Sequence, residues 1–239
     1  MRRSRARREL PDLTKITLRL PDPTRIEEGE LSKSTHTRKR IMDSAVNCLA
    51  ETGYAGTTTT TVAERAELTR TAMLYHFPSR MQLIEAVIYY VLRERLQLYI
   101  DEVKTIKSDD WSTIVDVAWG QLQTNLFRAF SELLMAARTD PDLQAIFGPA
   151  LAEYDRGRRE VALATYPEGY IDSPWFNLRR DVFRFLLEGL ALQGGLSYSA
   201  EKRKDDILGF LKALASRKEG ETLMNVVVSP PRRGKPGTK

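Results

Sequence analysis

The feature that most constrains this chain is a pair of short helical patterns within residues 58–77, joined by a connection of only a few residues. The hydroxyl run 57–61 precedes apolar positions with i, i+1, i+4 spacing, which lie on one face of a short helix: Val62, Ala63 and Ala66. Threonine is a good N-cap and a poor helix-interior residue, so we expect the first helix to begin within this run. The connection 66–68 is too short for a loop and suits a helix–helix turn.

A second short helix is expected after this turn. Thr69 is placed to cap it, and Pro78 should end it near Phe77, because proline disfavours the helical region at the preceding residue. Ser79 then offers an N-cap for a third helix beginning at Arg80. Donors suited to phosphates and base edges remain on the outer face of the second helix: Arg70, Thr71, Tyr75 and His76. Spacing alone leaves open a plain helical hairpin with a polar outer face.

The residues upstream favour a specific arrangement. A basic cluster at 38–40 leads into apolar residues at helical spacing, namely Ile41, Ala45, Cys48 and Leu49. We expect this helix to stop at Gly53, which adopts a left-handed conformation more readily than other residues. Three helices in this order therefore precede the long helix that starts near Arg80.

Together, residues 38–87 resemble the DNA-binding domain of TetR-family transcriptional regulators. The matching features are Ile41 with Ala45, Gly53-Tyr54, Thr57-Thr58, Val62-Ala63, Ala66, Leu74-Tyr75, Phe77, Ser79 and Leu83. Two positions depart from the family pattern. Glu67 stands where the turn usually has glycine, so it must accept a strained backbone if the turn needs positive φ. Arg80 stands where lysine is usual and keeps the positive charge.

The resemblance implies an all-α fold. It predicts an N-terminal three-helix, homeodomain-like helix-turn-helix domain at residues 35–82 and a helical ligand-binding and dimerisation domain at 83–218. The implied function is a ligand-responsive regulator, a repressor that binds a palindromic operator as a dimer and is released by a small-molecule effector. We expect Arg70 and Thr71 near base edges of double-stranded DNA. The residues expected to hold phosphates are Thr57, Thr58, Tyr75, His76 and Arg80.

Composition agrees with an all-α DNA-binding protein that needs no cofactor. Strand signals are sparse, and the prolines and glycines fall between long helical stretches. The chain has two histidines, His36 and His76, which excludes a histidine-based catalytic or metal cluster, and it has no phosphate-cradling glycine loop. We therefore expect a regulator rather than an enzyme, located in the cytoplasm. No apolar stretch is long enough for a membrane span.

The net charge of +5 is concentrated in the two ends of the chain. Residues 1–40 carry 12 basic and 6 acidic side chains, whereas residues 41–218 carry 21 basic and 24 acidic ones. We expect residues 1–34 to form a disordered basic arm and residues 219–239 a flexible tail. Such tails either add non-specific phosphate contacts or are merely solvated, and the sequence leaves both readings open.

The remainder of the chain predicts further helices. Asp140-Pro141 and Ser173-Pro174 each place a capping residue before a proline at the first helical position, and Ser199 is placed to cap a last helix. Helices at about 175–196 and 200–217 are expected to form a homodimer interface, although they could instead close the monomer's own core. The residues expected to bind an apolar or aromatic effector are Trp111, Trp119, Gln123, Phe127, Phe130, Tyr154 and Trp175.

Two other functions fit parts of these observations. A helical ligand-sensing or scaffold protein would carry the helix-turn-helix as a vestige. A membrane-surface protein would use the basic arm to reach anionic lipids.

Overall fold

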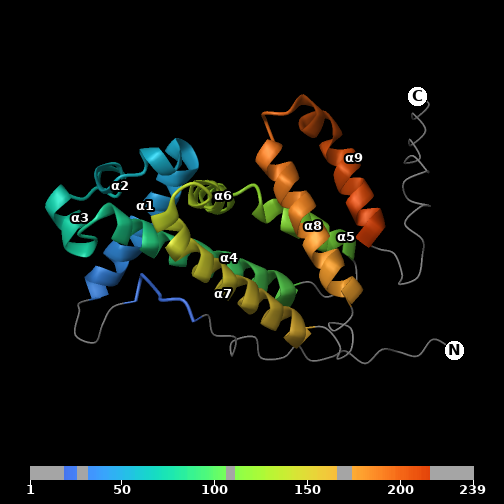
Figure 1. Ribbon diagram of the computed structural model, residues 1–239, viewed down its shortest axis with the longest axis horizontal. Helices are drawn as coiled ribbons and strands as arrows, with labels where there is room; N and C mark the ends of the chain where they lie inside the picture. Colours follow the sequence, from blue (N-terminus) through green and yellow to red (C-terminus); the bar gives the residue numbers. More distant parts are fainter. Residues whose placement is uncertain (1–18, 26–31, 106–110, 166–173, 216–239) are drawn as a thin grey trace. The chain divides into compact units, whose positions relative to one another are not determined.

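The computed structural model describes residues 19–25, 32–105, 111–165 and 174–215, and all regular structure within these ranges is helical (Figure 1). The helices are α1 (Ser32–Gly56), α2 (Thr59–Arg65), α3 (Arg70–His76), α4 (Arg80–Thr105), α5 (Trp111–Gln121), α6 (Asn125–Ala137), α7 (Pro141–Thr165), α8 (Pro174–Gln193) and α9 (Tyr198–Ala215). The expected all-α class is confirmed for this part of the chain. The expected tail at 219–239 lies outside the described residues.

The described helices divide into two compact units. The first contains residues 19–25 and helices α1–α4, α6 and α7, and the second contains α5, α9 and α8 from Asn177 onward. The first unit thus combines the three helices of the expected DNA-binding domain with α4, α6 and α7 of the region that follows.

Helix α4 is the central element of the first unit. Its buried side chains recur at spacings of one, three and four residues and cover more than one face: Leu83, Ile84, Val87, Ile88, Val91, Leu92 and Leu96. A stripe this wide needs cover on more than one side. Helices α1, α6 and α7 all pack against α4 and provide that cover.

Where the cap is described, helix starts follow the capping residues expected from the sequence, with one exception, and the cap expected within the hydroxyl run 57–61 is Thr58. The side chains of Thr58, Thr69, Ser79 and Asp140 each accept a hydrogen bond from a backbone N–H three residues further on. In α9, however, Ser197 rather than Ser199 takes this role, because its hydroxyl accepts from the Ala200 N–H at 3.3 Å and the helix begins at Tyr198.

The expected break at Gly53 is confirmed, because its φ of 73° and ψ of 179° are not helical, and a short helical segment follows it to Gly56. One other expectation about the first unit needs correction. The predicted disordered arm at 1–34 is wrong for its described part, because residues 19–25 contact α4 and α7 and α1 already begins at Ser32.

The second unit has its own small core. Val115 of α5, Leu187 and Leu190 of α8, and Leu208 and Leu211 of α9 form this buried cluster with Ala200. At the edge of the cluster, Lys212 of α9 forms an ion pair with Asp116 of α5 at 2.6 Å.

Candidate nucleic-acid interface

Helices α2 and α3 are each only seven residues long and depend on local hydrogen bonds at their ends. At the start of α2, Thr58 and Thr61 form a reciprocal capping box, in which each side chain bonds the other's backbone N–H at 3.1 and 2.9 Å. Thr69 caps α3 by accepting from the Ala72 N–H at 3.1 Å. These caps fix where each helix begins relative to the turn between them.

The turn between α2 and α3 requires a left-handed residue. Glu67 has a φ of 52°, a region that favours glycine, and it is the only non-glycine residue with positive φ in the described ranges. The backbone N–H of Leu68 then donates to the Ala63 carbonyl at 2.9 Å and closes the turn. The strain predicted for Glu67 is therefore confirmed.

One side of α3 is fixed to the protein and the other is open to solvent. Met73 is fully buried, together with Ala63 and Ala66 of α2, so small residues allow the two helices to approach closely. Arg70 and Thr71 are exposed, and Tyr75 is 74% exposed. The neighbouring His76 is partly buried, with its ring 5.3 Å from that of Tyr75 in an edge-on arrangement. The open side of α3 thus presents a guanidinium and two hydroxyl groups.

Two of the residues expected to hold phosphates have internal roles. Thr57 is 0% exposed and its hydroxyl donates to the Gly53 carbonyl at 2.8 Å, so its side chain is unavailable to a phosphate. Arg80 donates to the carbonyls of Thr57 and Tyr54 at 2.9 and 2.6 Å, and its guanidinium lies 4.3 Å from the centre of the Tyr54 ring. Burial therefore corrects the assignment of Thr57. Arg80 is partly buried and helps to hold α1 and α4 together, and its contact with a phosphate stays a prediction.

Further polar contacts fix α2 and α4 to α1. Arg65, in the last turn of α2, makes two parallel hydrogen bonds of 2.6 Å to the carboxylate of Glu51 on α1. The Tyr90 hydroxyl of α4 donates to Asp43 of α1 at 2.6 Å. These positioning residues were missed in the sequence, where each stands among many other charged residues without a distinguishing pattern.

The residues expected to bind an effector divide between the two units. Phe127 and Phe130 of α6 and Tyr154 of α7 are buried and come together in the first unit. Trp119 packs against the core of the second unit, and Gln123 is exposed in the connection between α5 and α6. Trp111 and Trp175 belong to α5 and α8, and their side chains lie outside the described part. The structure therefore brings together three of the residues predicted to bind an effector, namely Phe127, Phe130 and Tyr154.

A buried arginine lies at the centre of these three aromatic residues. The Arg95 guanidinium of α4 is 4.1 Å from the ring centre of Phe130, 5.2 Å from Phe127 and 5.9 Å from Tyr154. We call these four residues the Arg95 cluster. At its edge Arg158 of α7 donates to the Tyr154 hydroxyl at 3.3 Å. Burial alone would raise the pKa of Tyr154, but the charges of Arg158 and Arg95 outweigh it and lower this pKa.

The role of Arg95 was also missed in the sequence. A signal was present, because Arg95 falls within the apolar spacing of Leu92 and Leu96 on a face of α4 that the pattern predicts to be buried. An arginine at such a position is a candidate for stacking on aromatic rings.

The described residues contain neither a metal-binding group nor a membrane-spanning helix. These ranges contain no group of three or more histidine, cysteine or carboxylate side chains able to hold a metal ion. None of the described helices combines the length and apolar character required to cross a membrane. Cys48 is buried against α2, and burial raises the pKa of its thiol.

Comparison with known proteins gives a family match over the first four helices. Residues 41–87 match the model of "Bacterial regulatory proteins, tetR family". An uncharacterized HTH-type transcriptional regulator of Mycobacterium tuberculosis is 26% identical over 134 residues, which cover 54% of this chain and 67% of the relative.

Solved structures share the fold over most of the chain. A protein of Rhodococcus sp. assigned to the TetR family superposes with a TM-score of 0.56 at 19% identity, covering 76% of this chain and all of the other. A Saccharomonospora viridis protein assigned as a transcriptional regulator, whose crystal structure contains choline, gives a TM-score of 0.55 at 17% identity over 74% of this chain and 96% of the other. At these identities the likeness shows the fold alone.

Proposed function

We propose that the chain is a transcriptional regulator of the TetR family, which represses transcription by binding a palindromic operator as a homodimer until a small-molecule effector releases it. The observation that carries this proposal is α3, which presents Arg70, Thr71 and Tyr75 to solvent while its other side is buried. Double-stranded DNA is present in the cytoplasm, where we expect the protein to act.

We propose that Arg70 and Thr71 read base edges in the major groove. Both residues lie in the first turn of α3, and arginine is the side chain that most often pairs with guanine there. Tyr75, His76 and Thr58 are proposed as phosphate contacts, with His76 and Thr58 limited by their partial burial. In a dimer, two such helices would enter successive major grooves about 34–36 Å apart.

Selection of bound DNA from a random pool tests the proposed function directly. We expect the wild-type protein to enrich an inverted repeat. Arg70→Ala should weaken binding to that repeat by about 1–3 kcal/mol and relax the preference at one position of each half-site, measured by mobility shift on selected and scrambled DNA. The matched control is Arg159→Ala, which removes an exposed arginine from α7.

Several outcomes would contradict the proposal. If Arg70→Ala and Arg159→Ala bind selected DNA equally well, Arg70 does not read bases. If no sequence is enriched, the protein does not recognise an operator and the scaffold function gains support. Binding to anionic lipid vesicles without binding to DNA would instead support the membrane-surface function.

The Arg95 cluster is the proposed effector contact in the first unit. Its rings favour an apolar or aromatic compound. The crystal structure of the S. viridis protein contains choline, which is a cation. In this chain, a cation at the cluster would lie close to the positive charges of Arg95 and Arg158, which would repel it. We therefore propose an effector without positive charge.

Helix α6 connects this cluster to α1, the first helix of the proposed DNA-binding domain. Phe127 and Phe130 belong to the cluster, whereas Asn125 at the start of the same helix bonds Asn47 of α1 at 2.9 Å. Beyond the other end of α6, the Tyr54 hydroxyl of α1 donates to Asp140 at 3.3 Å. An effector that displaces α6 would disturb α1 at both points, and release then requires only that it bind the displaced conformation more tightly.

Thermal unfolding with simple probe compounds tests the sign of the effector's charge. Benzoate or benzyl alcohol should raise the melting temperature of the wild-type protein and not of Phe130→Ala, and choline should raise neither. A compound that raises the melting temperature should also release selected DNA. A larger shift with choline than with benzoate would overturn the proposed charge preference.

We propose that the homodimer forms through α8 and α9. Apolar residues at i, i+4, i+7 and i+8 spacing remain exposed along α8: Leu178, Val182, Phe185 and Leu186. Phe210 on α9 is also exposed. An exposed stripe of this kind on two adjacent helices matches a four-helix interface with a second copy of the chain.

A further inference from the structure

Residues 19–25, which we call the strap, lie across α4 and α7 and make polar contacts with both helices. The Arg19 backbone N–H donates to Oε1 of Glu153 on α7 at 2.7 Å. Arg93 of α4 donates from Nη1 to the Leu20 carbonyl at 3.0 Å, and its Nη2 lies 3.4 Å from the Asp22 carboxylate. The strap therefore joins two helices that are about 60 residues apart in the sequence.

The strap is organised internally as well. Asp22 accepts hydrogen bonds from the Thr24 N–H and hydroxyl at 3.0 and 2.7 Å, and its carbonyl accepts from the Arg25 N–H at 3.1 Å. Burial alone would raise the pKa of Asp22, but the bonds from Thr24 and the charge of Arg93 lower it. Leu20 and Pro23 are buried and serve as apolar anchors.

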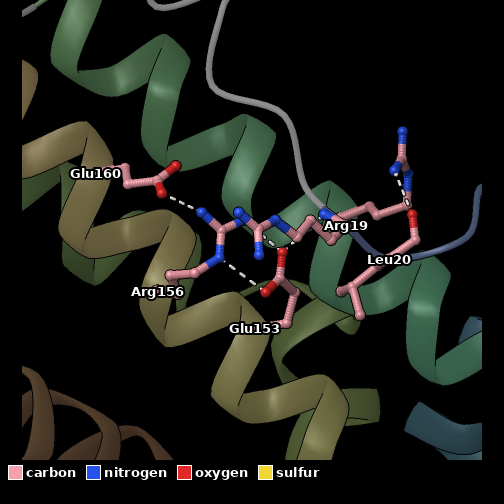
Figure 2. A network of polar contacts seen from close by, with 6 residues as sticks. Arg19, Leu20, Glu153, Arg156 and Glu160 are labelled. Atoms are coloured by element: carbon pink, nitrogen blue, oxygen red, sulfur yellow. Dashed lines mark hydrogen bonds and ion pairs between the residues drawn. The ribbon is translucent and has the colours of Figure 1, made fainter.

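The acceptor on α7 is held in place by its own helix. Arg156 donates from Nε to Oε2 of Glu153 at 2.8 Å and also bonds Glu160, so the Glu153 carboxylate is fixed where the Arg19 N–H meets it. Figure 2 shows this network, in which Arg156 lies between the carboxylates of Glu153 and Glu160 and Arg19 of the strap lies beside Glu153.

The strap joins α4 and α7 at the level of the Arg95 cluster. Arg93 is two residues before Arg95, and Glu153 immediately precedes Tyr154. A ligand that enters between Arg95 and Tyr154 must move α4 relative to α7, and the strap's contacts oppose that movement.

We propose that the strap is a regulatory clamp, whose attachment holds α4 against α7 and maintains the arrangement that binds DNA. The effect on DNA rests on the proposed function, whereas the clamp itself does not. Within the described residues, these contacts favour attachment and oppose the conformational entropy lost by ordering seven residues. A segment in this balance opens more readily than the core helices, which suits a regulatory element.

Two variants of the full chain test the clamp, one in the strap and one in α4. Leu20→Ser removes an apolar anchor from the strap and leaves α4 and α7 unchanged, and Arg93→Gln removes the contact from α4. Their matched controls are Leu163→Ser, at an exposed position of α7, and Lys104→Gln, near the end of α4. Backbone hydrogen exchange and affinity for DNA selected by the wild-type protein are measured for all of them.

We expect both strap variants to exchange about tenfold faster in α4 and α7, with no change in α2 and α3. They should also bind the selected DNA roughly threefold or more weakly, whereas the controls should match the wild type. Loss of protection in residues 19–25 without any change in α4 and α7 would overturn the clamp. If the helices loosen and DNA affinity stays unchanged, the regulatory role is wrong. Absence of any selected DNA would contradict the proposed function and leave the exchange test of the clamp intact.

Discussion

At the scale of single residues, Glu67 is where this chain departs most clearly from an unstrained backbone. Its φ of 52° places a side chain with a Cβ atom in a region that glycine occupies without penalty. The turn cannot relax, because the Leu68 N–H and the Thr69 cap hold both of its sides. The residue also places a carboxylate between the two helices of the proposed DNA reader.

Replacement of Glu67 by glycine should therefore stabilise the protein. We expect Glu67→Gly to raise the free energy of unfolding by about 1 kcal/mol, because a left-handed conformation costs an L-residue about 1–2 kcal/mol. Urea unfolding measures the change. Glu67→Ala is the control, since it removes the charge and keeps the Cβ atom. Equal stabilisation by the two variants would show that the carboxylate, rather than the backbone, carries the penalty.

At the scale of elements, α2 and α3 are too short to be stable by themselves. Their stability comes from caps at their starts, from small residues where they cross, and from contacts of Arg65 and Arg80 with neighbouring elements. Helix α6 is different, because it combines a buried aromatic face with a polar contact of Asn125 at its start. Each element thus has its own source of stability.

The capping box of α2 offers a direct test of this view. Thr58→Ala removes the acceptor for the Thr61 N–H and should lower the free energy of unfolding by about 1 kcal/mol. Thermal or urea unfolding without DNA isolates this effect from the proposed phosphate contact. Thr60→Ala, at an exposed position in the same helix, should change stability much less. A similar loss in both variants would mean that the capping box contributes nothing specific.

At the scale of the whole molecule, the proposed function requires two copies of the chain. A single α3 offers few contacts to DNA, and the middle of the sequence has no excess of positive charge. Two copies of α3 in a symmetric dimer would raise the affinity for DNA, and their arrangement would match the symmetry of an inverted repeat.

The exposed stripe of α8 provides the test of this dimer. Phe185 is 59% exposed, and Phe185→Glu should shift the protein from dimer to monomer in sedimentation at micromolar concentration, because the interface would then bury a charge. Affinity for the selected inverted repeat should fall in parallel. Leu163→Glu introduces the same charge at an exposed position of α7 and should leave the dimer intact. A wild-type monomer, or a Phe185→Glu dimer, would refute this interface.

The sequence by itself determined most features that depend on neighbouring residues. Helix starts at Thr58, Thr69, Ser79 and Asp140 were predictable because a cap and the N–H it bonds are three residues apart. The strain at Glu67 followed from the resemblance, because the family usually has glycine at this position of the turn. The open face of α3 followed from helical spacing, and the resemblance to TetR-family regulators followed from many such local features occurring together.

Only the tertiary structure decided how distant residues meet. Burial of Thr57 and the bonds of Arg80 to two carbonyls depend on how α1, α2 and α4 pack, which spacing does not encode. The same holds for Arg95 among three aromatic rings and for the strap, whose residues resemble a disordered tail until α4 and α7 supply their partners. Local hydrogen bonds are specified by adjacent residues, whereas these contacts exist only once separate helices have packed together.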